Sequence, residues 1–202
     1  YYAQRLADMV KVWRDLWGLG EMPFYEVELA PFTYGGDGTT GARIREAQHK
    51  AVELIPGSGI ASINDLAYPY EYDEIHPRRK KEVGERLSYL ALNRTYGMDY
   101  LPCEGPRFKS YEVRGGEIEV AFYNGESGFS PWHDIVGFEI AGEDKVFHPA
   151  EIRRGTRLNT VIVKSGKVPA PVAVRYCFRD FQVGNFTGRR CLPVIPFRTD
   201  NW

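Results

Sequence analysis

The sequence predicts a protein in two parts, an α/β half followed by a half built of antiparallel β strands. Up to about residue 100, segments with helical periodicity alternate with short strand-like segments, which is the order of a parallel sheet flanked by helices. After residue 101, short alternating runs are separated by turns rich in Gly, Asn, Asp and Pro. The helical pattern breaks near residues 99–106. The expected domains are therefore 1–100 and 101–202.

The first half contains three expected helices and two expected strands. An apolar stripe with spacings of three and four defines the first helix, which Gly18 ends. Pro77 is well placed as the first residue of the third helix, and Gly97 as its C-terminal cap. In folds of this kind, ligand sites lie beyond the carboxyl ends of the strands. The expected elements, in chain order, are helix 6–17, strand 24–29, helix 44–54, strand 60–63 and helix 77–96.

The second half is expected to form an antiparallel β domain. Its apolar residues alternate with polar ones over runs short enough to be strands, and turn residues separate each run from the next. The expected strands are 108–114, 117–122, 136–140, 160–164 and 172–178.

Composition argues against two classes of partner. Lys and Arg total 26 against 27 acidic residues, so a net charge of −1 offers no electrostatic footprint for nucleic acid. No apolar run approaches the roughly 18 residues that a membrane span requires. The three cysteines lack the C-x-x-C spacing of a zinc site. We expect neither a nucleic acid nor a membrane as a partner.

The residues that carry most chemical information are 72–77, where a carboxylate stands three residues ahead of an imidazole. Asp73 can fold back to accept the Nδ1 proton of His76, which leaves Nε2 free to take a proton from a hydroxyl nucleophile. That pair is half of a catalytic triad. Considered alone, the pair could also have a purely structural role. Asp is a common helix N-cap, and a residue that precedes a proline, as His76 precedes Pro77, is often only a conformationally restricted turn residue.

Eight short segments, spread over almost the whole length of the chain, form an ordered set of motifs. They are 15–18 (DLWG), 29–32 (LAPF), 45–48 (REAQ), 73–77 (DEIHP), 83–87 (VGERL), 137–144 (GFEIAGED), 171–176 (PVAVRY) and 196–200 (PFRTD). In these segments and their order, the chain resembles the C-terminal part of the sialate O-acetylesterase family, serine esterases of the SGNH (GDSL) hydrolase superfamily.

The resemblance implies that the first half is the C-terminal portion of a three-layer, flavodoxin-like catalytic domain, followed by a β-sandwich-like domain. It assigns the triad acid to Asp73 and the base to His76. The nucleophilic serine and the oxyanion-hole donors of the family lie in upstream blocks that have no match here. We therefore expect an N-terminal segment or a companion chain to carry the serine. The resemblance also implies an O-acetylated carbohydrate substrate, no metal or organic cofactor, and a secreted or periplasmic location.

Four further residues are candidates for the edge of the pocket. Arg45, Glu46 and Gln48 match a family motif, although such residues near a helix start also make structural ion pairs and capping contacts. Tyr72 and the nearby loop tyrosines could pack a sugar ring or simply pack locally. His49, on the same helix as the motif, is expected to be an exposed helix residue.

Three departures from the family pattern are informative. Glu28 replaces a common glutamine, which leaves fine substrate choice open. Cys177 and Cys191 stand where the resemblance leads us to expect alanine and glycine. Their joint presence motivates a disulfide hypothesis, with Cys103 unpaired.

The sequence leaves two questions open. Sialic acids lead as substrates because of the resemblance, and acetylated xylan or another plant polysaccharide is the close rival. An alternative of another class is a non-catalytic carbohydrate-binding module, whose β half would present Trp132, Tyr123 and Phe129 to a glycan. The β half could also be only a structural brace.

Overall fold

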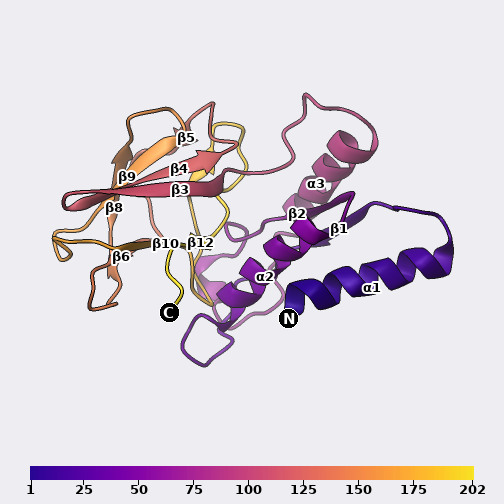
Figure 1. Cartoon of the computed structure of the whole chain (residues 1–202), viewed down its shortest axis with the longest axis horizontal. Helices are drawn as coiled ribbons and strands as arrows, with labels where there is room; N and C mark the ends of the chain where they lie inside the picture. The colour runs from indigo at the N-terminus through magenta and orange to yellow at the C-terminus, as the bar shows by residue number, and fades with distance from the viewer.

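The computed structural model describes all residues, 1–202, and shows an α/β half joined to a β half (Figure 1). The elements of the first half follow the predicted order. They are α1 (Tyr2–Trp17), β1 (Phe24–Val27), α2 (Thr40–Leu54), β2 (Ser58–Ala61), the 3-10 helix η1 (Pro69–Glu71), α3 (Lys80–Leu90) and the π-helical turn η2 (Ala91–Thr95).

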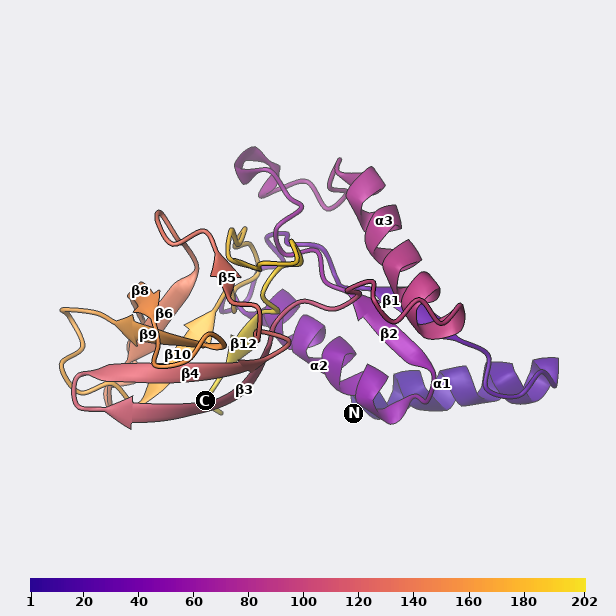
Figure 2. The same cartoon turned by 90° about the horizontal axis from the view of Figure 1, so that it is seen from above.

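The sheet of the first half consists of β1 and β2, which pair in parallel with Phe24 opposite Ser58 and Val27 opposite Ala61. Helix α3 lies on one side of this pair, and α1 and α2 lie on the other (Figure 2). Val10, Ala51 and Ile55 form a small buried cluster between α1 and α2. The mixed α/β character is thus confirmed, whereas the complete three-layer SGNH fold stays a prediction.

Helix α1 was predicted correctly, but its apolar residues are only partly covered. Gly18 ends the helix in the left-handed conformation, with φ of 65°, and its N–H donates to the carbonyl of Arg14. Val10 faces α2 and is buried, whereas Leu16 and Trp17 are 77% and 62% exposed. None of the helices is both long and apolar enough to cross a membrane.

The β half consists of two four-stranded antiparallel sheets and one short strand pair. The sheet orders are β3-β4-β9-β8 and β12-β10-β6-β7, and β5 pairs with β11. The elements are β3 (Arg107–Arg114), β4 (Glu117–Tyr123), β5 (Phe129–Ser130), β6 (Phe138–Ala141), β7 (His148–Pro149), β8 (Glu151–Arg154), β9 (Thr160–Lys164), β10 (Ala173–Tyr176), β11 (Thr187–Gly188) and β12 (Phe197–Arg198).

The core of this half is one cluster of 15 buried residues contributed by both large sheets. Alternate residues of β4, Ile118, Val120 and Phe122, are fully buried, which is the pattern of a strand with one face on the core. Phe197 of β12 contacts the ring of Phe122 edge-on, with centroids 5.7 Å apart. The predicted antiparallel, sandwich-like second half is confirmed.

Several details differ from the predictions. The third helix begins at Lys80 and not at Pro77, and its last turn is π-helical. The sequence patterns predict no strand at β5, β7, β8, β11 or β12, most of which have only two residues. The disulfide hypothesis is wrong, because Cys177 is a buried free thiol and Cys191 an exposed one.

The two halves are tied together by polar contacts. Arg198 of β12 forms an ion pair with Glu46 of α2 at 3.1 Å. Asp180 joins the loop before α2 to the β half: its N–H donates to the Gly38 carbonyl at 2.6 Å, and its carboxylate accepts from the Gly41 N–H at 2.6 Å.

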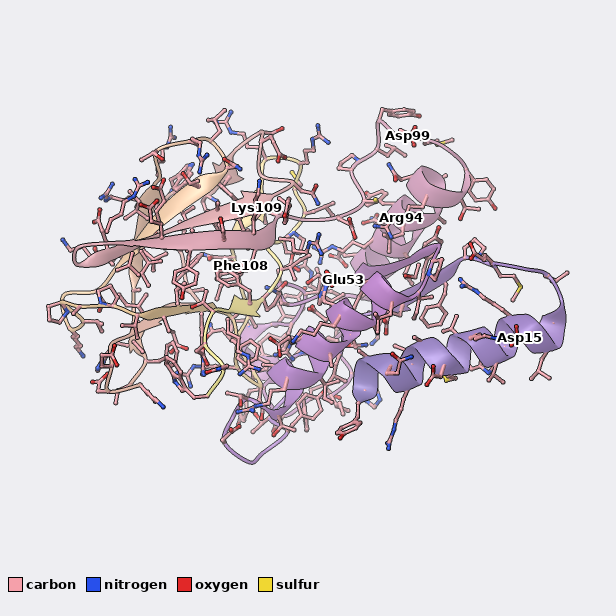
Figure 3. All side chains as sticks on the ribbon, viewed as in Figure 1. Asp15, Glu53, Arg94, Asp99, Phe108 and Lys109 are labelled. Carbon is pink, nitrogen blue, oxygen red and sulfur yellow. The ribbon has the colours of Figure 1, made fainter.

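A second set of contacts joins the halves near the chain segment that connects them. Glu53 of α2 lies beside the start of β3 (Figure 3), and its carboxylate pairs with Arg107 at 2.5 Å. Arg94, at the end of the helical segment that follows α3, pairs with Glu104 at 2.7 Å. Together, these contacts connect the two halves into one unit.

Candidate functional site

The carboxyl ends of β1 and β2 meet at a fully buried carboxylate, that of Glu28. It accepts hydrogen bonds from the Ser62 hydroxyl at 2.8 Å and the Ile63 N–H at 3.0 Å, and His49 Nε2 lies 3.0 Å from its other oxygen. Burial alone would raise the pKa of Glu28, but the bonds and the charge of its neighbours outweigh it and lower the pKa. The expected exposure of His49 was wrong, because its side chain is only 15% exposed.

A buried arginine fixes the turn that follows β2. Arg86 of α3 donates to the Ser62 carbonyl at 2.7 Å and to both carboxylate oxygens of Asp65 at 2.6 Å. Such a two-bond contact restrains orientation as well as distance. The turn is followed by Leu66 and Ala67, which are buried, and the chain then returns to the surface.

The surface loop that carries the predicted triad residues is held at its base by Glu71. The Glu71 side chain is 1% exposed, and its two oxygens accept from the Tyr68 N–H at 2.8 Å and the Arg78 N–H at 3.3 Å. These bonds bring residues 68 and 78 to the same carboxylate. A second restraint acts on the Tyr72 carbonyl, which accepts from the N–H and the hydroxyl of Thr33. Residues 73–76 are left at the tip.

At that tip, Asp73 and His76 are both exposed, and no hydrogen bond joins them. The N–H of His76 donates to the Glu74 carboxylate at 3.0 Å, and Nδ1 of the ring lies 3.5 Å from the same oxygen. The imidazole is 82% exposed. The structure thus places the two predicted residues on one loop with the imidazole open to solvent, while Glu74 occupies the position beside Nδ1 that was expected for Asp73.

The other candidate pocket residues have protein partners. Arg45 is buried and donates to the carbonyls of Arg179 and Asp180. Gln48 is also buried and accepts from the Leu29 N–H at 2.7 Å. Glu46 pairs with the arginine of β12 that joins the two halves. Arg45, Glu46 and Gln48 thus make structural ion pairs and hydrogen bonds, as the alternative interpretation of their sequence motif allowed. Their role at the edge of the pocket stays a prediction.

The loop tyrosines pack against one another. The rings of Tyr68 and Tyr70 are stacked, with centroids 5.3 Å apart and an interplanar angle of 5°. The guanidinium of Arg78 lies over the Tyr70 ring at 5.8 Å. Tyr72 is 55% exposed. Tyr72 therefore remains the one candidate of the four whose side chain is open to a ligand beside the tip.

No hydroxyl of the chain stands in the position of a nucleophile. No serine is hydrogen-bonded to a histidine side chain, and the imidazole contacts with carboxylates are those of His49 with Glu28 and of His76 with Glu74. Ser127 lies in a turn closed by a hydrogen bond from the Gly128 N–H to the Gly125 carbonyl. The chain brings together no group of three His, Cys, Asp or Glu side chains that could hold a metal ion.

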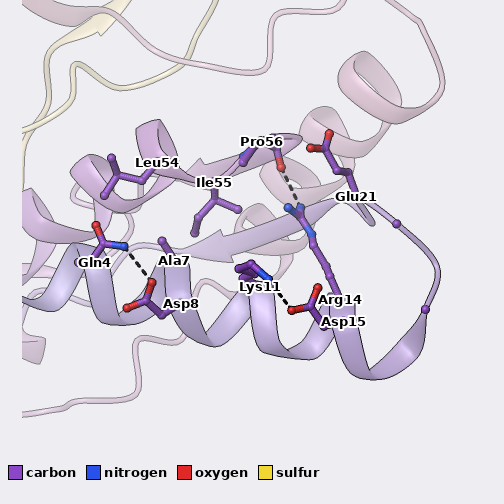
Figure 4. Close-up of a pocket in the computed structure, with 12 residues that line it drawn as sticks. Gln4, Ala7, Asp8, Lys11, Arg14, Asp15, Glu21, Leu54, Ile55 and Pro56 are labelled. Atoms are coloured by element: carbon purple, nitrogen blue, oxygen red, sulfur yellow. Dashed lines mark hydrogen bonds and ion pairs between the residues drawn. The ribbon is translucent and has the colours of Figure 1, made fainter.

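One of the larger hollows lies away from this loop, between α1 and the turn after α2 (Figure 4). It has a volume of about 650 Å³. Four of its five charged side chains already have partners: Asp8 accepts from Gln4 at 2.9 Å, Lys11 pairs with Asp15 at 2.5 Å, and Arg14 donates to the Pro56 carbonyl at 2.8 Å. These contacts leave little unpaired charge for a ligand.

Comparison with known proteins shows a likeness to a solved structure. No family model matches the sequence, and no curated protein matches it. Among solved structures, the chain is similar to a carbohydrate acetylesterase from Xanthomonas citri, with 39% sequence identity and a TM-score of 0.87. The similarity covers 100% of this chain and 46% of that chain, so the chain spans about half the length of the structure it matches.

Sequence reasoning missed the residues that hold the loop. Glu71 and Arg86 are charged residues, and sequence periodicity does not distinguish a buried charge from an exposed one. A usable signal existed for Glu71, because Pro69 followed by a glutamate two residues later fits the start of a short helix with a capping contact.

Proposed function

We propose that this chain is part of a carbohydrate O-acetylesterase in which Asp73 and His76 serve as the acid and the base of a Ser-His-Asp triad. The observation that carries the proposal is the likeness, over the whole chain, to an acetylesterase that acts on carbohydrates. The exposed imidazole on a loop that follows the carboxyl end of β2 supports it, because ligand sites of parallel α/β folds lie at that end.

The serine and the oxyanion-hole donors would come from polypeptide outside these 202 residues, either a preceding segment or a companion chain. His76 Nε2 takes the serine proton, and the serine oxygen attacks the acetyl carbonyl carbon. When the tetrahedral intermediate collapses, His76 protonates the departing sugar oxygen. Water then attacks the acetyl-serine by the same route, which releases acetate and restores the serine. Asp73 stays ionised and stabilises the imidazolium.

The first test measures hydrolysis of p-nitrophenyl acetate by the complete enzyme, together with the masses of all polypeptides that copurify with this chain. His76→Ala is expected to abolish activity while the circular dichroism spectrum and the unfolding midpoint stay unchanged, because the side chain is exposed. The matched control is His133→Ala, another exposed histidine on a loop. Activity of the His76 variant within a few-fold of wild type would remove the assignment.

A second comparison asks which carboxylate supports the imidazole. In the complete enzyme, Asp73→Asn is expected to lower kcat by on the order of 10⁴, as loss of the triad acid does in a serine protease. Glu74→Gln is expected to change kcat by less than about tenfold, because its carboxylate contacts the imidazole from an exposed position. The reverse ranking would transfer the acid role from Asp73 to Glu74.

For the substrate, we propose acetyl esters of sugars, with O-acetylated sialic acids as the leading class and acetylated xylan as the rival. Nothing in the loop itself recognises the sugar beyond the ester. Acetate release from an O-acetylated sialic acid and from acetylated xylan, measured at equal ester concentration, ranks the two. A preference for xylan would replace the sialate hypothesis and leave the esterase mechanism intact.

A further inference from the structure

The β half carries a second hollow, with a volume of about 690 Å³. It lies between the turn that precedes β5 and the connection from β8 to β9. Its floor includes Phe129, which is 1% exposed. Phe129 is therefore part of the core, and its ring is not presented at the surface as the binding-module alternative required. The polar and aromatic side chains around the hollow include those of Glu126, Trp132, Arg154, Arg157, Asn159 and Arg189.

The hollow is lined by three arginines whose guanidinium groups have no carboxylate or carbonyl partner. Most other arginines of the chain have one; Arg153, the residue next to Arg154, pairs with Glu117 at 2.6 Å. Arg157 and Arg189 form hydrogen bonds through their backbones only. Guanidinium groups present planar sets of N–H donors that match a carboxylate. Three such groups line one hollow and give it a positively charged surface whose N–H donors suit an anion.

One of these guanidinium groups is held in a defined position, and the carboxylates near the hollow have other partners. The guanidinium of Arg154 lies over the Trp132 ring, 5.2 Å from its centroid, a contact that favours a defined position of the cation. The two nearby carboxylates have other partners: Glu112, which the charge of Arg157 also affects, pairs with Arg114 at 2.8 Å, and Glu119 is bound by Arg114 and by threonine hydroxyls. Glu126 is the one carboxylate among the lining residues and forms no ion pair.

The remaining polar groups suit a sugar. Glu126 and the side-chain oxygen of Asn159 can accept hydrogen bonds from hydroxyls, since the Asn159 amide N–H₂ already donates to the Phe122 carbonyl. The volume falls within the range of about 300–1,000 Å³ that is usual for small-molecule sites. The net charge of −1 for the whole chain makes this a local cationic site and not part of a broad basic face.

We propose that this hollow binds a carboxylate-bearing sugar, with the carboxylate on Arg157 and Arg189 and the hydroxyls on Glu126 and Asn159. The carbohydrate part of this inference rests on the proposed function. The site is separate from the loop that carries His76, so it serves to hold an acidic glycan and not to cleave it. Two sources have the required chemistry, a sialic acid and a uronic acid.

The test is isothermal titration of the 202-residue chain with two matched pairs of probes, sialyllactose against lactose and glucuronate against glucose. We expect the acidic member of at least one pair to bind at least about tenfold more tightly than its neutral partner, since bonds to a charged group are the stronger ones. The pair that shows the preference identifies the source of the carboxylate. Equal affinities within both pairs would overturn the proposal.

The variants Arg157→Gln and Arg189→Gln are each expected to weaken binding of the preferred acidic sugar by about tenfold or more. The control is Arg190→Gln, because Arg190 is equally exposed and adjacent in sequence but lines other hollows. An equal loss in the control would overturn the assignment, as would sulfate binding as tightly as the acidic sugar. The titration requires no ester hydrolysis, so its result is independent of whether the complete enzyme is an esterase.

Discussion

Replacing Glu71 by alanine tests whether one buried carboxylate holds the loop that carries Asp73 and His76. The change removes two acceptors, one for the Tyr68 N–H at 2.8 Å and one for the Arg78 N–H at 3.3 Å. A hydrogen bond to a charged group contributes about 1.5–3 kcal/mol, and the longer bond contributes less. We expect a loss of about 2–4 kcal/mol in the free energy of unfolding. For a chain of this size that corresponds to a fall in Tm of roughly 4–16 °C.

Urea unfolding followed by circular dichroism measures the global loss, and hydrogen exchange of the amides of residues 68–78 measures the local one. We expect both the stability and the protection of the Tyr68 and Arg78 amides to fall. Glu85→Ala is the matched control, because its only ion pair is an exposed one with Lys81 at 3.7 Å, which contributes little. Ordinary surface substitutions change the free energy of unfolding by up to about 0.5 kcal/mol. If Glu71→Ala changes it by no more than that and leaves the amide hydrogen exchange of residues 68–78 unchanged, the loop is held by other contacts.

Glu119, the cysteines and Glu28 give three more predictions. Burial raises the pKa of Glu119, but hydrogen bonds from neighbouring threonines and an arginine lower it to about 2. The ionised Glu119 therefore stabilises the fold fully at neutral pH, and this stabilisation is lost as the pH falls from about 5 towards 2. In urea unfolding, the free energy of unfolding of Glu119→Gln should be lower than that of wild type by up to about 3 kcal/mol at pH 7, and this difference should narrow at pH 3. A difference that does not change with pH would contradict the assignment. The Cys191 thiol should react with iodoacetamide in the native protein, whereas Cys177, whose pKa burial raises to about 12, should react only after unfolding, as peptide mass spectrometry can show. Glu28→Ala should destabilise the chain by about 3 kcal/mol. Glu28→Gln should destabilise it by less, because the amide oxygen still accepts a hydrogen bond from the Ile63 N–H. If thermal unfolding shows the same loss of stability for both variants, only the charge of Glu28 matters.

The order of helices and strands was predictable because it depends on patterns within short windows of sequence. Helix α1, the Gly18 cap and five strands of the main β sheets, β3, β4, β6, β9 and β10, follow from periodicity and turn residues. What periodicity does not give is which side of an apolar helix is covered. In α1 the sequence shows a single apolar stripe, yet Leu16 and Trp17 of that stripe are mostly exposed, because α2 contacts only one side of the helix.

The candidate site was predictable only in part, because its loop is held by contacts between residues distant in sequence. Asp73 and His76 are three residues apart and could be recognised as a pair. The bond of His49 to Glu28 joins positions 21 residues apart, and that of Arg86 to Asp65 joins positions 21 residues apart as well. An exposed histidine on α2 was therefore the reasonable default, and it was wrong because the buried carboxylate at the end of β1 faces that helix.

The arrangement of the loop bears directly on how the predicted triad would form. Glu71 and the Thr33 contacts restrain the loop up to Tyr72 and again at Arg78, so the adjustable part is the four residues 73–76. Within such a short segment, the carboxylates of Asp73 and Glu74 compete for the single Nδ1 of His76, and in this structure Glu74 is the nearer one. Both are exposed, so the preference between them costs little to reverse. A substrate or a protein surface that excludes water from the tip would strengthen the carboxylate–imidazole contact that it buries. The surroundings of the tip, and not its sequence alone, therefore decide which carboxylate serves as the triad acid.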